Sequence, residues 1–263
     1  MVKVWLSSDA KIQNSEVKAA PKSTQVQAST DRAANHFDAN HAAAMQMDQM
    51  TAALRGYFSA TNIDELIRHV RHPQRVRPLM EEYYKNRPLV ANPMTNKPPN
   101  FDYVQNESLG NFWAGACELS DGKISSAYLE ILSTGEPKVD WETMIHYQPM
   151  DWDEYSQKRP IGEPMDFRLY AENGYQYIDE FEDKTAWRCY RLTNKFSETV
   201  IYGYIKAGSP LEKELTQSIE SRRSKKRSLI LRLNVPIKIE AKQSVIIEKI
   251  VSKYWIMMDS PTP

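Results

Sequence analysis

Residues 111–132 read NFWAGACELSDGKISSAYLEIL, with alternating apolar and polar residues on both sides of Asp121-Gly122. A period of two is typical of strands that bury one face, and Asp-Gly is a favoured dipeptide for a tight hairpin turn. This stretch therefore predicts an antiparallel hairpin with strands over 111–119 and 123–132.

A second hairpin is predicted farther along the chain, where residues 165–171 and 175–181 flank Asn173-Gly174 in the same way. Period-two runs predict further strands over 185–192, 200–206, 229–239 and 245–257, with short helices over 152–158 and 210–220. The chain beyond residue 100 is thus expected to form mainly antiparallel sheet.

Ahead of the first hairpin the apolar period lengthens to that of a helix. Met47, Met50 and Leu54 begin such a face in a first helix, predicted from about residue 42. The next run, NIDELIRHV at 62–70, opens with a capping box of Asn62 and Glu65. Four apolar residues at i, i+3, i+4 and i+7 predict one face of a second helix: Ile63, Leu66, Ile67 and Val70.

A third helix is predicted from Pro73, which suits a first helical turn, to the residues before Pro88. Helices followed by antiparallel strands favour the α+β class over the alternating units of a parallel sheet. We expect the three N-terminal helices to pack on one strongly curved antiparallel sheet. The expected apolar face of that sheet consists of Leu229, Leu231, Leu233 and Val235.

Residues 1–41 have the composition of a disordered arm or tether, being rich in Ser, Ala, Gln, Lys and Asn with few large apolar side chains. A single α+β domain is predicted over 42–259. The opening MVKVWL is too short for a signal-peptide core or a transmembrane helix. We therefore expect a soluble chain, with a membrane tether missing from this chain as the alternative.

Charge gives no general direction toward a partner, because 34 basic residues balance 34 acidic ones. We expect no nucleic-acid partner. The one basic cluster lacks interleaved aromatic residues and is interpreted as a solvated loop. It consists of Arg222, Arg223, Lys225, Lys226 and Arg227.

Cys117 and Cys189 are the only cysteines, which excludes a disulfide framework and a four-thiolate zinc site. Both lie in strand-like runs and are interpreted as buried thiols, with their pairing left open. His69 and His72 are spaced i, i+3, yet no third ligand stands nearby, so no metal site is predicted. No phosphate-binding glycine loop or dinucleotide fingerprint occurs, and we expect no cofactor.

Three motifs carry a resemblance: LRGYFSATNIDELIRHVRHPQRVRPLMEEYYKNRPL at 54–89, KVDWE at 138–142 and FRLY at 167–170. They resemble uncharacterised proteins of Verrucomicrobia and Planctomycetes, and the run over 138–160 resembles the cone-shaped fold of the nuclear-transport-factor-two-like superfamily. The resemblance implies a cone fold over about 45–257. It implies no particular activity, because that superfamily hosts enzymes, binders and scaffolds. Similar proteins often carry an N-terminal membrane anchor, which implies the bacterial cell envelope; the cytoplasm is the alternative.

Enzymes of the cone fold place an acid or base in the pocket between sheet and helices. The resemblance makes Asp140, His146, Tyr147 and Tyr170 the candidates here. No second acid or base stands at a defined offset from them, so structural roles are favoured.

The aromatic residues predicted to line a ligand pocket are Trp113, Trp141, Trp187 and Tyr202. The alternative is that they belong to the core, as strand aromatics usually do. Our leading hypothesis is a non-catalytic module, monomeric or homodimeric, that binds a protein or a small ligand. The alternatives are a small-molecule isomerase or hydrolase with an acid or base in the cone pocket, and an envelope-assembly scaffold.

Overall fold

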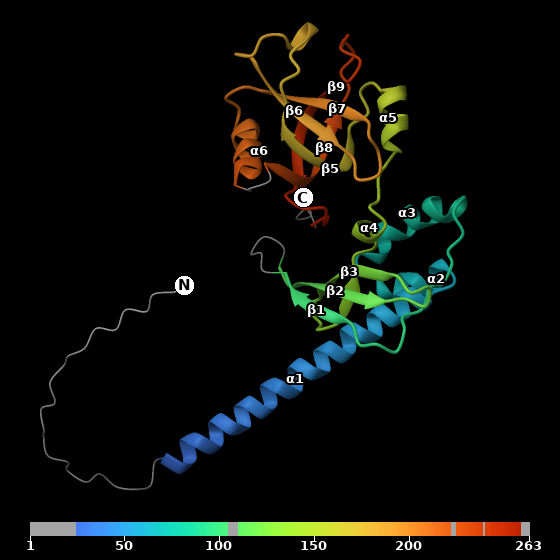
Figure 1. The fold of residues 1–263 in the computed structure, drawn as a ribbon, viewed down its shortest axis with the longest axis vertical. Coiled ribbons are helices and arrows are strands. Elements are labelled where there is room, and N and C mark those ends of the chain that lie inside the picture. The colour runs from blue at the N-terminus through green and yellow to red at the C-terminus, as the bar shows by residue number, and fades with distance from the viewer. Residues whose placement is uncertain (1–24, 105–109, 222–224, 239, 259–263) are drawn as a thin grey trace, which may run out of the picture. The chain divides into compact units, whose positions relative to one another are not determined.

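The structure is a computed structural model that describes residues 25–104, 110–221, 225–238 and 240–258 (Figure 1). The chain divides into two units, Met1–Gln46 and Met47–Pro263. Within the described residues the class is α+β, as predicted, with six α-helices and two mostly antiparallel sheets.

Helix α1 (Gln25–Ser59) crosses the boundary between the two units and starts well before the predicted residue 42. Residues 25–46 contain many alanines and neither Gly nor Pro, so their intrinsic helix propensity is high although they lack an apolar stripe. The arm predicted over 1–41 therefore overlaps a helix from Gln25 onward. Its residues 1–24 lie outside the described part of the chain.

The second predicted helix is a single α-helical turn, α2 (Ile63–Leu66), followed by a 3-10 turn, η1 (Ile67–His69). Asn62 caps it as predicted, because its side chain accepts a hydrogen bond of 2.9 Å from the Glu65 amide. The Glu65 carboxylate reaches one residue farther back than predicted and accepts from the Thr61 amide at 2.8 Å. The third helix, α3 (Pro73–Lys85), begins at the predicted proline.

The first sheet has four antiparallel strands in the order β1-β2-β3-β4. Its strands are β1 (Asn100–Tyr103), β2 (Phe112–Glu118), β3 (Ile124–Ile131) and β4 (Pro137–Val139). The hairpin predicted at Asp121-Gly122 is confirmed, with Gly122 in the left-handed region at φ +80°. The Leu119 amide donates to the Lys123 carbonyl at 2.9 Å, so the loop consists of residues 120–122, as the predicted strand bounds imply.

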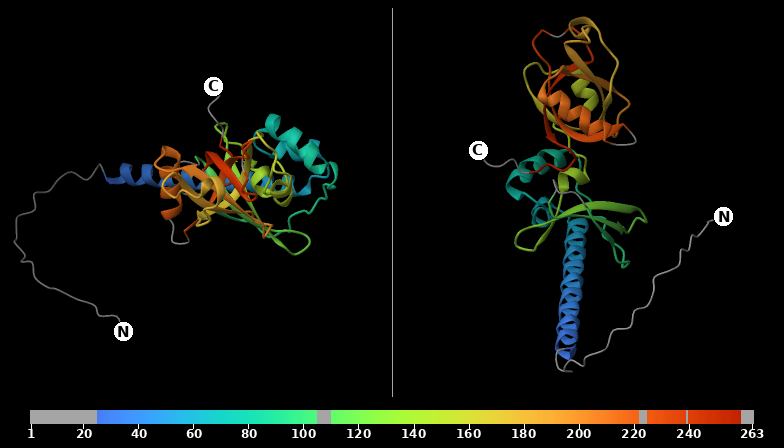
Figure 2. Two further views of the ribbon diagram at one scale, coloured as in Figure 1. Left: turned by 90° about the horizontal axis from the view of Figure 1, so that it is seen from above. Right: turned by 90° about the vertical axis from the view of Figure 1, so that its left-hand side faces the viewer.

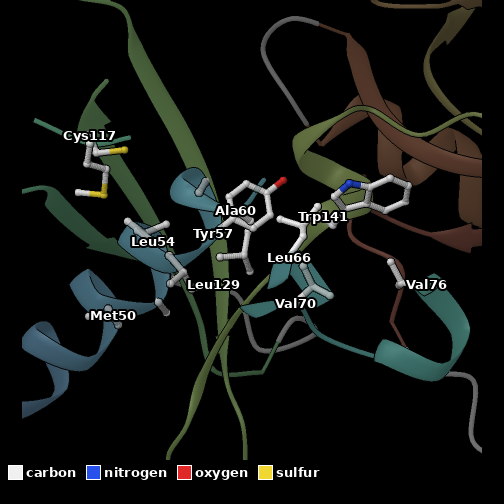
Figure 3. Close-up of a cluster of buried hydrophobic side chains, with 14 of the residues drawn as sticks. Met50, Leu54, Tyr57, Ala60, Leu66, Val70, Val76, Cys117, Leu129 and Trp141 are labelled. Atoms are coloured by element: carbon white, nitrogen blue, oxygen red, sulfur yellow. The ribbon is translucent and has the colours of Figure 1, made fainter. Parts of the chain in front are cut away.

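The helices pack on this first sheet. Leu54 and Tyr57 of α1 lie against Leu66, Val70 and strand β3, as Figure 3 shows. We call this cluster the first core; it also takes in Val76 of α3 and Trp141 of α4 (Trp141–Met144).

The second sheet closes into a barrel with the strand order β5-β6-β7-β9-β8. Its strands are β5 (Met165–Asn173), β6 (Trp187–Thr193), β7 (Val200–Lys206), β8 (Lys226–Asn234) and β9 (Ser244–Ser252). All pairs are antiparallel except β7 with β9. Helix α6 (Pro210–Glu220), between β7 and β8, packs against the barrel (Figure 2), and α5 (Trp152–Lys158) precedes β5.

The predicted contact between the N-terminal helices and the C-terminal strands is wrong. Leu229, Leu231, Leu233 and Val235 pack in a separate barrel core with residues such as Phe167 and Leu192. Pairing of β5 with β8 closes the barrel and encloses this face, so no apolar surface is left there for Leu66. The helices and the barrel strands each have their own apolar partner.

The second predicted hairpin is also wrong. Strand β5 runs on to Asn173, and the next element is the 3-10 turn η2 (Asp179–Phe181) instead of a strand. Gly174 serves a close approach of backbones, since a Cβ there would lie 2.9 Å from the Arg191 amide nitrogen and 2.7 Å from the Cys189 sulfur. The dipeptide thus marks a crossing of two segments and not a turn.

Replacement of Gly174 by Ala is expected to lower the free energy of unfolding by about 1–3 kcal/mol, because the new methyl group overlaps backbone atoms that cannot move independently. Urea denaturation followed by circular dichroism measures the change. Asn173→Ala is the neighbouring control and should stay within about 0.5 kcal/mol. Equal stability of the two variants would contradict the close approach.

Candidate functional site

A buried arginine joins three segments of the unit Met47–Pro263. Arg71 is 3% exposed, and its Nε donates to Glu130 of β3 at 2.7 Å. Its Nη1 donates to Asp140 at 2.9 Å and to the carbonyl of Met257 at 3.0 Å. Arg71 therefore ties the first sheet to the segment that follows β9.

A second buried arginine, Arg168 on β5, makes the matching link from the barrel. It is 1% exposed and donates to the carbonyls of Trp255 and Tyr147, each at 2.9 Å. Its Nη2 lies 3.3 Å from Glu142 of α4, whose other carboxylate oxygen pairs with Arg75 at 2.6 Å. We call these contacts of Arg71 and Arg168 the junction; helix α4 and residues 253–258 are its shared elements.

Both carboxylate oxygens of Asp140, the candidate acid, have partners in or next to the junction. Its carboxylate caps α4 by accepting from the Thr143 amide at 2.9 Å and pairs with Arg71 on its other oxygen. With both oxygens occupied and only 2% of the residue exposed, the carboxylate has no open position for a substrate proton.

His146, the candidate base, is buried without a polar partner. Its ring packs edge-on against Trp255 at 4.3 Å and Phe196 at 5.4 Å between centroids, and its backbone is left-handed at φ +53°. Among the described residues neither ring nitrogen has a hydrogen-bond partner. Burial, together with the nearby cations Arg168 and Lys195, lowers the pKa of His146 to about 4, so the imidazole is neutral at neutral pH.

The two candidate tyrosines serve packing. Burial and the charge of Glu142 raise the pKa of Tyr147, whose ring lies 5.9 Å from Trp141. Tyr170 packs on Trp255 at 4.7 Å, and the Lys226 ammonium lies over its ring at 4.3 Å. Within the described part of the chain, no hydrogen bond or ion pair joins the side chains of Asp140, His146 and Tyr147.

Titration of His146 predicts a loss of stability in mild acid. The unfolded imidazole binds a proton near its ordinary pKa of 6.5, whereas the folded one does so only near 4. The unfolded state thus binds more protons in this window, and stability should fall by about 2–3 kcal/mol between pH 6.5 and 4. His146→Phe keeps the ring packing and should flatten this part of the stability curve, measured by denaturant unfolding at each pH. An unchanged slope would assign the loss to other groups.

The four aromatic residues predicted to share a pocket lie in different clusters. Trp113 and Trp141 belong to the first core, whereas Trp187 and Tyr202 lie on the outer face of the barrel. The predicted common pocket does not form among the described residues, because these four side chains belong to two separate hydrophobic clusters.

The barrel has the connectivity of the OB-fold, with a helix between its third and fourth strands. Such barrels bind ligands on the outer face of strands two and three, here β6 and β7. On this face the ring of Phe181, from η2, stacks on Tyr204 with centroids 3.8 Å apart and an interplanar angle of 6°. The chain therefore covers part of this face with the ring of Phe181.

The basic cluster is only in part the predicted loop. Lys226 and Arg227 are the first residues of β8, paired with Glu172 and Ala171 of β5. Arg222 and Arg223 lie outside the described residues. Because the strand fixes the backbone of Lys226 and Arg227, these two cations have defined positions.

A cavity of about 350 Å³ lies where these two cations meet the junction. We call it the junction cavity; its wall includes Tyr128 of β3, Thr143 of α4, Arg227 and Ser228 of β8, and Tyr254 and Trp255. Lys226 also lines it, and Val104 and Ile256 add apolar surface. Its volume falls in the range of small-molecule sites, and its wall combines aromatic rings with a few polar groups.

Both cysteines are free and buried, and burial raises the pKa of each thiol. In the part of the chain that the structure describes, no three His, Cys, Asp or Glu side chains gather in a way that could hold a metal ion. The described helices include none with the length and apolar character needed to cross a bilayer.

No protein-family model, curated protein or solved structure matches this chain. Sequence patterns missed Arg71 and Arg168, whose partners lie far away along the chain.

Proposed function

We propose that the protein is a non-catalytic binding module that holds a small organic ligand in the junction cavity. The observation that carries this proposal is the wall of the cavity, where rings and hydroxyl groups surround about 350 Å³ of space. Several segments contribute to that wall, and the buried contacts of Arg71 and Arg168 hold them in place.

Binding is favoured over catalysis by the state of the candidate acid and base. Asp140 is occupied by Arg71 and the α4 amide, and neither ring nitrogen of His146 has a hydrogen-bond partner among the described residues. General acid–base catalysis requires a titrating group within hydrogen-bond reach of the substrate. None of the candidates Asp140, His146 and Tyr147 lines the junction cavity.

The neutral fluorescent probe N-phenylnaphthylamine tests this proposal. We expect saturable binding with one site per chain, read as a rise in probe emission in an apolar cavity. Ser228→Trp should fill the cavity and weaken binding at least tenfold, whereas Ser228→Ala should leave it unchanged. Probe binding that is the same in both variants would place the ligand elsewhere and overturn the proposal.

We also propose that the cone-fold resemblance concerns residues 47–144, where helices and one antiparallel sheet share the first core. The barrel is then an addition to the cone. An experimental structure in which β1–β4 curl around the helices would support this, and a flat sheet would contradict it.

A further inference from the structure

We infer that the ligand of the junction cavity is a small organic anion, with its acidic group on Arg227 and an aromatic or apolar body against Tyr254 and Trp255. This inference rests on the proposed function and adds the chemical class of the ligand.

Arg227 is the first support, because its guanidinium has donors to spare. It lies over the ring of Tyr254 at 4.8 Å, and no carboxylate or carbonyl of the described residues accepts from it. Its Nε is buried and unpaired. A buried donor without an acceptor is costly, and an arginine fork binds carboxylate, sulfonate or phosphate oxygens in pairs.

The charge of the cavity wall is the second support. Among the described residues, the wall contains Lys226 and Arg227 but no Asp or Glu. An arginine elsewhere on the same strand behaves differently, since Arg232 is held by both oxygens of Asp166 at 2.8 and 2.9 Å. Arg227, beside which the described wall places no carboxylate, favours an anion.

The rest of the wall defines the body of the ligand. Tyr254 and Trp255 offer ring faces, and Val104 and Ile256 offer aliphatic surface. The Ser228 hydroxyl also lines the cavity and gives a further donor for an oxyanion. A bare inorganic ion would leave the apolar surface uncovered, so a compact organic acid fits better than free phosphate.

The test compares two probes that share an aromatic body. Anilinonaphthalene sulfonate carries a sulfonate group, and N-phenylnaphthylamine lacks it. For the unmodified protein we expect the sulfonate probe to bind at least tenfold more tightly, and we expect only its affinity to fall with added salt. Benzoate and phenyl phosphate are then used as competitors, and the stronger one identifies a carboxylate or a phosphate as the preferred acid group.

Variants of Arg227 test whether this residue causes the preference for an anion. Arg227→Gln should weaken the sulfonate probe at least tenfold with little effect on the neutral probe, and Arg227→Lys should restore part of the loss. Arg232→Gln removes the same charge from the same strand outside the cavity and should change neither affinity. Circular dichroism melts establish that each variant is folded.

The outcomes separate the two proposals. Equal affinities for the two probes, both abolished by Ser228→Trp, would overturn the anion inference and keep the cavity as a binding site. Insensitivity of both probes to Ser228→Trp would overturn the proposed function as well. A salt-sensitive preference that survives Arg227→Gln would also overturn the role of Arg227.

Discussion

Replacement of Arg71 by Met is expected to lower the free energy of unfolding by about 3–5 kcal/mol, because a buried ion pair is broken from one side. Asp140 is 2% exposed and would lose the cation that pairs with it. The Met257 carbonyl would lose a donor as well, since Arg71 donates to it at 3.0 Å. Guanidinium denaturation followed by circular dichroism measures the loss.

An exposed arginine of similar chemistry provides the control. Arg77 on α3 pairs with Asp64 at 2.8 Å, but the two side chains are 43% and 75% exposed. Arg77→Met should therefore cost no more than about 1 kcal/mol. Adding Asp140→Asn to Arg71→Met should recover part of the loss, because the orphaned charge is gone. A cost below about 1 kcal/mol for Arg71→Met would show that Asp140 finds water or another cation.

Truncation of Leu129 to Ala is expected to cost about 2–5 kcal/mol, since this fully buried side chain lies on β3 in the first core. Ile124, at the exposed end of the same strand, is the control, and Ile124→Ala should stay within about 0.5 kcal/mol. Thermal unfolding of the Leu129 variant also tests the predicted single domain over 42–259. One transition would mean that the junction couples the two cores, and an early transition confined to part of the signal would mean that it does not.

Much of the secondary structure could be predicted from residues that are close together in the sequence. Ser209 caps helix α6, and Pro210 is the first residue of its first turn. The predicted bounds of this helix match the observed ones. The hairpin at Asp121-Gly122 was also predictable, because its two strands are adjacent in sequence and are joined by a favoured turn dipeptide.

Long-range pairing was not predictable in this way. Closure of the barrel depends on β5 meeting β8, and a period-two pattern says only that a face is buried, not against which element. Gly174 had the sequence signature of a turn, although its backbone instead passes close to Arg191.

In the candidate site, too, local sequence indicated the region but not the contacts between distant residues. The run over 138–160 indicated the region of α4, yet Arg71 and Arg168 had no predicted role, because their partners lie far along the chain. Arg227 was assigned to a solvated run, because a cluster of basic residues gives no indication of where a strand begins.

The bond from Arg71 to the Met257 carbonyl spans 186 residues, which has a consequence during synthesis on the ribosome. At about 5–20 residues per second, roughly 10–40 s separate the two ends of that bond. During this interval the helices and first sheet can assemble while Arg71 still lacks one acceptor. Arg168, once made, awaits Trp255, which lies 87 residues farther along the chain. The nascent chain must therefore keep these arginines hydrated, and their charge helps a half-made protein to remain dispersed until residues 253–258 emerge.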